Sequence, residues 1–252
     1  MKQITLMYHD VYAKDVKESG FDTPGAIHYK ISEDVFIEHI EAISNYCASK
    51  GINKDDIVFT FDDGGVSFYT IIAPILEKYG WKGHFFISTK YIGTDGFLTG
   101  NQIKELSRRG HIIGSHSHRH KVLTEFSVND IENELCTSVK ILSDILEKPI
   151  DSISIPNGCY NKEILNIVHK NELRIVYTSN PTSLIKRIES MILVGRYAVV
   201  YNTKAEDVIS ILSSSFLRFR MKFKYQILQI VKQLLGTYYS KIKMAIRKNF
   251  IK

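Results

Sequence analysis

Short apolar runs alternate with longer amphipathic stretches along most of the chain. Runs of about four to eight apolar or β-branched residues are typical of strands, and they occur at residues 4–9, 56–61, 84–88, 111–115, 152–156, 174–179 and 192–199. Apolar positions repeated every three or four residues are typical of helices, and they occur between these runs at 32–51, 66–79, 99–110, 127–147 and 161–171. The pattern therefore predicts strands that alternate with helices.

The ends of several predicted helices carry recognisable signals. Ser32 is placed to cap the N-terminus of the helix at 32–51, and Gly51 follows its end. Ser127 and Asp130 resemble a capping box at the start of 127–147. Pro74 lies inside 66–79, where its missing N–H and its ring predict a kink.

The alternation favours parallel pairing of the strands, and hence an α/β fold in the form of an open sheet or a barrel. The chain has 252 residues, 44% of them hydrophobic, which is enough for the core of one such domain. In these folds, reactive groups gather beyond the C-terminal ends of the strands. The residues that follow the predicted strands are therefore the candidates for a functional site.

Charge is distributed unevenly between the body of the chain and its C-terminal end. The formal net charge is +6, but residues 216–252 hold ten Lys or Arg and no acid. The other residues hold 23 basic and 27 acidic side chains. We therefore predict a mildly acidic domain at 1–215 and a basic helical tail at 216–252.

The tail combines its basic residues with regularly spaced apolar ones. "FLRFRMKFKYQ" alternates the two kinds, and a helix from there would present one apolar face, formed by Ile227, Ile230, Val231, Leu234 and Leu235. This pattern favours an amphipathic helix on an anionic membrane surface. The alternative is a helix packed on the body with a solvated basic face. Nucleic acid is not an expected partner, because no recognised binding module surrounds the charge.

Segments that direct a chain across a membrane are missing from the pattern. No stretch approaches the roughly 20 apolar residues of a membrane-spanning helix, and "MKQITLMYHDV" is too short for a signal-peptide core. The cysteines Cys47, Cys136 and Cys159 are far apart, which argues against a disulfide framework. We predict a cytoplasmic protein, held by its tail at the inner face of the cell membrane.

Three predicted strands end in residues that bind metal or move protons. His9 ends the first, Asp62 and Asp63 follow the second, and "HSHRH", which contains His116 and His120, follows 111–115. On a helical turn, two histidines four residues apart face the same way. Two histidines and one carboxylate make a three-ligand zinc site that leaves a position for water, as catalytic zinc sites do.

Bound zinc makes water nucleophilic at neutral pH, and a second carboxylate can take its proton. Asp62 and Asp63 can divide these tasks, but their positions alone do not say which residue ligates. Adjacent acids in a solvated turn and histidines on the surface are the alternatives. Their joint occurrence at strand ends favours a catalytic site.

Two of these segments resemble the motifs of a known family. "TFDDG" at 60–64 and "GSHSHRHKVLTEFS" at 114–127 are similar to the first two motifs of the polysaccharide deacetylases (NodB homology, carbohydrate esterase family 4). The resemblance covers about residues 1–200. It implies a distorted (β/α)7 barrel and metal-dependent removal of N-acetyl groups from sugars. By motif, Asp62 is the general base, Asp63, His116 and His120 are the zinc ligands, and Ser117 braces the loop.

The chain departs from the family pattern in two places. In "SISIPNGCYN", Ser154 replaces the usual arginine and Asn157 the usual tyrosine, around Pro156. The last motif is absent near 192–199, but "LMYH" at the start resembles it, as in the circularly permuted exopolysaccharide deacetylases. We therefore expect His9 to be the general acid, the alternative being a core histidine bonded to backbone.

Arg196 is the candidate to replace the missing arginine beside Asp62, where it would lower the pKa of the carboxyl group. The alternative for Arg196 is a surface salt bridge. Pro156, Asn157 and Ser117 complete the predicted site as supporting residues, with a backbone N–H near Asn157 at the oxyanion. Zinc is the expected metal, although cobalt or nickel fit the same ligands.

The resemblance and the predicted tail together imply a substrate class. We expect N-deacetylation, with release of acetate, of an N-acetylated glycan or a lipid-linked saccharide at the membrane. One alternative is a deformylase of a lipid-linked formamido sugar, since only the acyl pocket would differ. The other is a membrane-associated module that binds glycan without catalysis, although such a module would not need the Asp62, Asp63, His116 and His120 set.

Overall fold

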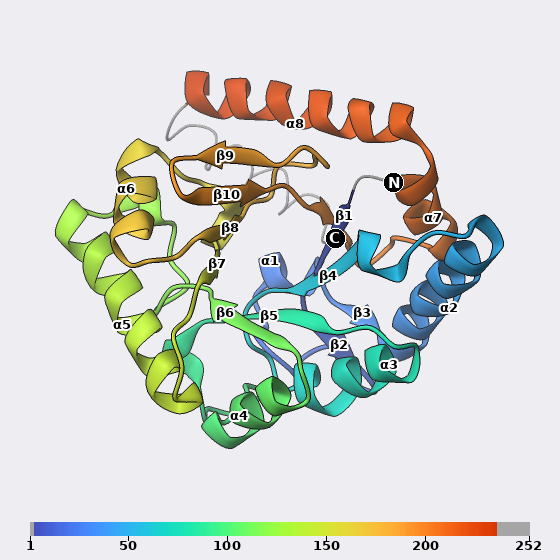
Figure 1. The fold of residues 1–252 in the computed structure, drawn as a ribbon, viewed down its shortest axis with the longest axis horizontal. Coiled ribbons are helices and arrows are strands. Elements are labelled where there is room, and N and C mark those ends of the chain that lie inside the picture. Colours follow the sequence, from blue (N-terminus) through green and yellow to red (C-terminus); the bar gives the residue numbers. More distant parts are fainter. Residues whose placement is uncertain (1–2, 236–252) are drawn as a thin grey trace.

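A curled, mostly parallel sheet forms the centre of the molecule in the computed structural model, which describes residues 3–235 (Figure 1). In this part of the chain the strand order is β11-β1-β4-β5-β6-β7-β8-β10-β9, and β9 alone pairs antiparallel, with β10. The bounds are β1 Ile4–Tyr8, β4 Ile57–Phe61, β5 Gly83–Ile87, β6 Ile112–Ser115, β7 Ser152–Ser154, β8 Ile175–Tyr177, β9 Lys186–Ile188, β10 Met191–Val194 and β11 Tyr197–Ala198. A separate parallel pair is formed by β2 Val11–Tyr12 and β3 Ile31–Ser32.

A very short connection joins β11, at one end of the sheet, to β10, the second strand from the other end. The chain leaves β10, which pairs with β8, and enters β11, which pairs with β1 at the other end of the strand order. Only Gly195 and Arg196 separate the two strands. The sheet therefore curls into an incomplete barrel whose seam lies between β10 and β11. The prediction of an α/β fold with a barrel-like sheet is confirmed.

The prediction of one strand over 192–199 is wrong, because the seam divides it. Gly195 approaches other backbone so closely that a Cβ there would lie 2.4 Å from the carbonyl oxygen of Asn180. Arg196 then donates its N–H to the same carbonyl at 2.9 Å instead of continuing a ladder. The apolar pattern runs on across this break, since both strands are buried.

Most of the helices cover the outside of the curled sheet, whereas the short α1 lies within the ring of strands in the view of Figure 1. Their bounds are α1 Pro24–Ile27, α2 Glu33–Lys50, α3 Ala73–Lys78, α4 Gly100–Arg108, α5 Val128–Leu146, α6 Lys162–Lys170, α7 Ala205–Ser213 and α8 Ser215–Leu235. Ser32 and Ser127 cap α2 and α5 as predicted, each accepting from a backbone N–H three residues on. The helix predicted over 66–79 is divided into a π-helical turn at Phe68–Ile72 and α3, and Pro74 lies in the first turn of α3.

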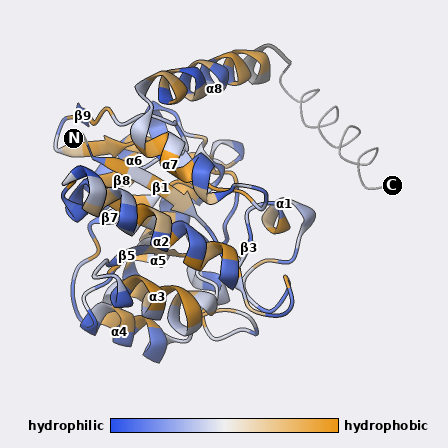
Figure 2. Cartoon of the chain, turned by 90° about the vertical axis from the view of Figure 1, so that its right-hand side faces the viewer, coloured by the Kyte–Doolittle hydropathy of each residue, from blue (hydrophilic) through white to orange (hydrophobic). Residues whose placement is uncertain are grey.

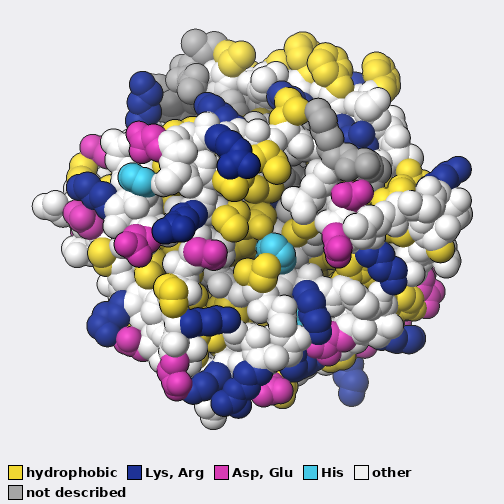
Figure 3. Space-filling view, viewed as in Figure 1, with side chains coloured by type: hydrophobic (Ala, Val, Ile, Leu, Met, Phe, Trp, Pro, Cys, Tyr) yellow, Lys and Arg dark blue, Asp and Glu magenta, His cyan; other side chains and the backbone are white. Residues whose placement is uncertain are grey.

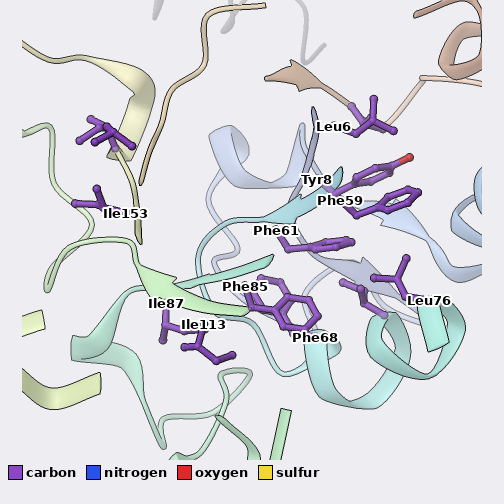
Figure 4. Close-up of a cluster of buried hydrophobic side chains, with 14 of the residues drawn as sticks. Leu6, Tyr8, Phe59, Phe61, Phe68, Leu76, Phe85, Ile87, Ile113 and Ile153 are labelled. Atoms are coloured by element: carbon purple, nitrogen blue, oxygen red, sulfur yellow. The ribbon is translucent and has the colours of Figure 1, made fainter. Parts of the chain in front are cut away.

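Aromatic rings fill the core between the sheet and the helices (Figure 4). Phe61 stacks on Tyr8 with ring centroids 5.6 Å apart and contacts Phe85 at 5.3 Å. Phe68 stacks on Phe85 at 5.0 Å. All residues of β1 are buried, as expected for parallel strands covered on both faces, which explains the continuous apolar runs of the sequence.

Helix α8 lies along one side of the barrel, next to α7 and beyond β9 and β10 in the view of Figure 1. Leu217 and Met221 pack against the core, and Arg218 Nη1 donates to the carbonyl oxygens of Ile211 and Leu212 at 2.7 and 2.9 Å. The rest of the predicted tail, residues 236–252, lies outside the described residues. Among residues 3–235, no helix combines the length and the apolar character required to cross a membrane.

Candidate active site

The reactive residues lie just beyond the C-terminal ends of neighbouring parallel strands. His9 follows β1, Asp62 and Asp63 follow β4, and His116 follows β6. Strand β5 lies between β4 and β6, and Ser88 at its end joins them: its N–H donates to the Asp63 carbonyl at 3.2 Å, and its hydroxyl to the His116 carbonyl at 3.3 Å. Residues separated by more than 50 positions in the sequence therefore meet at one end of the barrel.

Asp63, His116 and His120 form a cluster that fits a divalent metal. Their ligand atoms all lie within 4.8 Å of one another. Asp63 Oδ1 is 3.1 Å from His120 Nε2 and 3.5 Å from His116 Nε2. Asp63 Oδ1 and His116 Nε2 are buried and have no hydrogen-bond partner among the described residues. Convergent buried atoms with free lone pairs are the donor set that a metal ion requires.

The protonation of the two histidines suits this interpretation. His116 Nδ1 lies 2.8 Å from the carbonyl oxygen of Ser154, so it carries the proton and donates it, which leaves the Nε2 lone pair facing the cluster. Burial lowers the pKa of His120 to about 4, so its ring is neutral near pH 7. Neutral imidazole is the form that binds metal.

The histidine loop is not the helical turn that the spacing of His116 and His120 indicates. Ser117 and His120 adopt left-handed backbone angles, with φ of 60° and 54°, and no helix spans residues 116–120. The two rings nevertheless lie close together, with centroids 4.9 Å apart. Two residues in the left-handed conformation thus bring the two imidazole rings together, as one helical turn would. The spacing of the histidines in the sequence does not reveal such a loop.

Backbone hydrogen bonds hold this loop against its neighbours. The carbonyl of Ser117 accepts from Thr89 N–H at 3.2 Å, and the N–H of Ser117 donates to Ser115 Oγ at 3.1 Å. The Ser117 hydroxyl is buried and has no partner in the described part of the chain. Ser117 therefore braces the loop through its backbone. His118 lies apart from the ligands, with Nδ1 3.0 Å from Thr89 Oγ1.

Glu134 on α5 anchors the middle of the same loop. Its carboxylate accepts from the backbone N–H of Arg119 at 2.8 Å and also pairs with the Arg119 guanidinium. Glu134 is buried, with 2% of its surface exposed. Sequence reasoning missed it, although a charged residue beside Ile131 and Leu135 on the apolar face of a predicted helix was an available signal.

Asp62 is held by an arginine. Arg196 Nη1 donates to Asp62 Oδ1 at 2.7 Å and Nη2 to Oδ2 at 2.8 Å. Ser154 completes the group: its hydroxyl donates to Asp62 Oδ2 at 3.0 Å and accepts from Arg196 Nη2 at 2.8 Å. Arg196 is 1% exposed, so the alternative of a surface salt bridge is excluded.

The environment of Asp62 favours its ionised form. Burial alone would raise the pKa of the carboxyl group, but the positive charge of Arg196 and its hydrogen bonds outweigh burial and hold this pKa well below its usual range. Asp62 Oδ2 accepts from both Arg196 and Ser154, so it is Oδ1 that retains a second lone pair beyond its bond to Arg196. The geometry therefore separates the two aspartates, one toward the imidazoles and one toward a guanidinium.

His9 joins the site from β1. Its ring stacks on Tyr29 with centroids 4.5 Å apart, and its Nδ1 is buried without a hydrogen-bond partner in residues 3–235. Burial lowers the pKa of His9, although the negative charges of Asp63 and Asp62 act in the opposite direction. The neighbouring Asp10, which the sequence reasoning also missed, is buried and accepts from the hydroxyls of Ser19 and Ser67 at 2.7 and 3.0 Å.

Pro156 and Asn157 follow β7 in a 3₁₀ turn, Pro156–Gly158. Pro156 is buried, whereas Asn157 is exposed and left-handed, with φ of 57°. The N–H of Gly158 is used inside the turn, where it donates to the Ile155 carbonyl at 3.0 Å. A contact of the Asn157 backbone with an oxyanion stays a prediction.

Comparison with known proteins identifies relatives of this domain. A family model described as polysaccharide deacetylase matches residues 49–176. The Bacillus subtilis protein YxkH is 33% identical over 182 residues, which are 70% of this chain and 64% of that protein. Peptidoglycan-N-acetylmuramic acid deacetylase PdaA of Bacillus subtilis is 29% identical over 133 residues, 51% of this chain and 49% of PdaA. The chain thus spans less than two thirds of these curated relatives.

Solved structures share the fold. The Streptococcus pyogenes deacetylase PplD, in complex with acetate, superposes with a TM-score of 0.70 at 21% identity, over 85% of this chain and 99% of that one. IcaB from Ammonifex degensii superposes with a TM-score of 0.66 at 17% identity, over 84% of this chain and 97% of that one. At these identities the likeness concerns the fold alone.

Proposed function

Because the chain belongs to the polysaccharide deacetylase family, we propose that it is a metal-dependent hydrolase that removes the acetyl group from an N-acetylated amino sugar of a glycan. The observation that carries this proposal is the Asp63, His116 and His120 cluster beside an ionised Asp62 and a histidine, His9, at one end of the barrel. Relatives named as deacetylases of peptidoglycan support the substrate class.

A divalent ion held by Asp63, His116 and His120 would polarise the acyl carbonyl and acidify water, which is the chemistry that catalytic zinc supplies. We infer zinc from two imidazoles and one carboxylate, while cobalt or nickel fit the same donors. Removal of metal with a chelator, followed by titration with each ion in turn, would establish which one restores activity.

The chain's own residues then have separate tasks. Asp62, kept ionised by Arg196, accepts a proton from the attacking water as the oxygen bonds to the acyl carbon. His9 donates a proton to the sugar nitrogen as the carbon–nitrogen bond breaks, so that the products are acetate and a free amine. The burial of Asp62 and Asp63, which are each 3% exposed, limits competing contacts with water.

The proposal is tested by assaying acetate and free amine together on N-acetylglucosamine oligomers and on peptidoglycan fragments. Stoichiometric release of both, abolished by chelator and restored by metal, is the expected result. Release of formate from a formamido sugar, with no acetate from any N-acetylated substrate, would favour the deformylase instead. Glycan binding without release of any acid would favour a non-catalytic module.

We also propose that α8 holds the protein at an anionic membrane surface. Its outer face carries an apolar stripe at helical spacing, 46–69% exposed, formed by Phe216, Phe219, Phe223, Ile227 and Ile230. Figure 2 shows apolar residues along α8, and Figure 3 shows hydrophobic side chains at the upper edge of the molecule, where α8 lies. Arg220, Lys222 and Lys224 lie among them, and α8 contains no acid.

The exposed apolar stripe can insert among the acyl chains of a membrane, while the basic residues beside it bind the anionic lipid headgroups. A membrane position would favour a lipid-linked saccharide, or a glycan close to the membrane, as the substrate. The inner face of the cell membrane remains the predicted location. Co-sedimentation with phosphatidylglycerol vesicles should fall strongly in Phe219→Glu/Phe223→Glu and should be weak with phosphatidylcholine alone. Equal binding of the variant and the wild type would contradict this role for α8.

A further inference from the structure

The connection from β1 to α2, residues 9–32, places aromatic rings on two histidines of the site. Tyr29 lies nearly parallel to His9, with ring centroids 4.5 Å apart and an angle of 29° between the planes. Phe21 stacks in the same way on His120, at 4.9 Å and 22°. One segment of the chain therefore forms two aromatic walls beside the reactive groups.

The wall on the His9 side continues outward to solvent. His28 meets Tyr29 edge to face with ring centroids 5.2 Å apart, and the ring of Tyr201 lies tilted against His28 at 5.3 Å. Tyr201 is 60% exposed, and its N–H donates to the His28 carbonyl at 2.9 Å. A continuous run of rings thus leads from the proposed general acid to an exposed tyrosine.

The wall on the Phe21 side is closed by further packing. Phe21 contacts Tyr91 at 4.7 Å and Phe97 at 5.0 Å, both edge to face, and Tyr91 stacks on Phe97 at 5.1 Å. Phe21 is half-buried by these contacts, whereas Tyr201 at the end of the other run is 60% exposed. The run that ends at Tyr201 therefore offers the aromatic surface on which a substrate can lie.

Buried polar contacts hold the β1–α2 connection in place. Lys30 is 2% exposed, and its Nζ donates to the carbonyl of Val16 at 2.8 Å and to that of Ser19. Gly20 N–H donates to the Gly96 carbonyl at 2.8 Å. Asp10 ties Ser19 to the turn that follows Asp63, through Ser67. A wall built in this way is preorganised, so a ligand need not order it.

We propose that Tyr29 and Tyr201 form a sugar-binding subsite for the glycan residue next to the one that is deacetylated. This inference rests on the proposed function for the position of the reacting sugar. One face of a pyranose ring presents C–H groups, which pack on the electron-rich face of an aromatic ring. An isolated exposed tyrosine would mean little, but Tyr201 is connected to His9 by a run of contacting rings.

The test uses Tyr201→Ala with Tyr201→Phe as its matched control, because Tyr201 touches none of the reacting groups. Steady-state kinetics are measured on N-acetylglucosamine and on its oligomers of increasing length. The expected result for Tyr201→Ala is a rise in KM of about 2- to 10-fold on the oligomers only, with kcat little changed. Tyr201→Phe keeps the ring and should stay close to the wild type. Equal KM values for Tyr201→Ala and the wild type at every length would overturn the subsite.

A binding measurement separates this inference from the proposed function. Isothermal titration of the same oligomers into the wild type and Tyr201→Ala reports the subsite without turnover. Weaker binding by Tyr201→Ala, in a protein that releases no acetate, would leave the subsite standing and reject the deacetylase. Oligomers that bind both proteins equally, in a protein that releases acetate, would reject the subsite and keep the deacetylase.

Discussion

Arg196→Met removes the guanidinium that neutralises a carboxylate buried beside the metal cluster. In the structure, Arg196 makes two bonds to Asp62, one to the Ser154 hydroxyl, one to Thr60 Oγ1 at 3.2 Å and one to the Thr178 carbonyl at 3.2 Å. Loss of one partner of a buried ion pair costs about 3–5 kcal/mol, because the other charge stays buried. At about 2–4 °C per kcal/mol for a domain of this size, the midpoint of thermal unfolding should fall by roughly 6–20 °C.

Urea unfolding of the wild type, Arg196→Met, Asp62→Asn and the double variant provides the thermodynamic cycle. The double variant should be more stable than the sum of the two single losses predicts, by about 1–3 kcal/mol, because it leaves no unpaired buried charge whereas each single variant does. Without the arginine, burial should raise the pKa of Asp62 and remove the base, with a loss of about 100-fold or more in kcat. A coupling below about 0.5 kcal/mol would refute the argument.

Three further variants test other parts of the structure. Glu134→Gln weakens the hydrogen bond that holds Arg119 in the histidine loop, so the affinity for zinc should fall by about 10-fold. The affinity is measured by competition with a chromophoric chelator. An unchanged affinity would contradict the role of Glu134 in positioning the loop. Hydrogen bonds from Arg109 lower the pKa of Glu77 to about 2 from 4.5, so its contribution to stability is present above pH 4.5 and disappears as the pH falls toward 2. Glu77→Gln should therefore lower the free energy of unfolding by about 1 kcal/mol at pH 7 and by much less near pH 2.5; equal differences at both pH values would contradict this. Gly114→Ala would place a Cβ 2.6 Å from the ring of Phe86 and should cost about 1–3 kcal/mol in urea unfolding, so a neutral effect would show that the ring can move.

The sequence predicts most of the sheet because parallel strands covered on both faces leave continuous apolar runs. The small strands β2, β3 and β9 were missed, since two or three residues leave no pattern, and β9 is largely exposed. The break between β10 and β11 was missed for the opposite reason: both sides of it are apolar. The pattern of apolar residues shows which residues are buried. It does not show where the chain leaves one strand of the sheet and pairs with another.

At the site, residue type and position at strand ends were enough to bring Asp62, Asp63, His116 and His120 together. The resemblance, and not the spacing, assigned different roles to the two aspartates. The loop geometry at Ser117 and His120 could not be read from spacing, because left-handed non-glycine residues are held by contacts with distant segments.

Ser154 shows how a departure from a motif can be resolved only in three dimensions. In the sequence, a serine at the expected arginine position looks like the loss of a functional group. In the structure, its small side chain lies against Arg196, which reaches Asp62 from the seam of the barrel, and its hydroxyl bonds to both partners. The guanidinium comes from a residue 42 positions away, which no local pattern can indicate.

The central claim is that Asp63, His116 and His120 hold a metal while Asp62 acts on the substrate. The most direct measurement is metal content and acetate release, determined together on purified wild type, Asp62→Asn and Asp63→Asn, with N-acetylglucosamine oligomers as substrate. The account predicts about one metal per chain with acetate for the wild type, metal without acetate for Asp62→Asn, and loss of both for Asp63→Asn. Full activity of Asp62→Asn, or full metal content in Asp63→Asn, would contradict it.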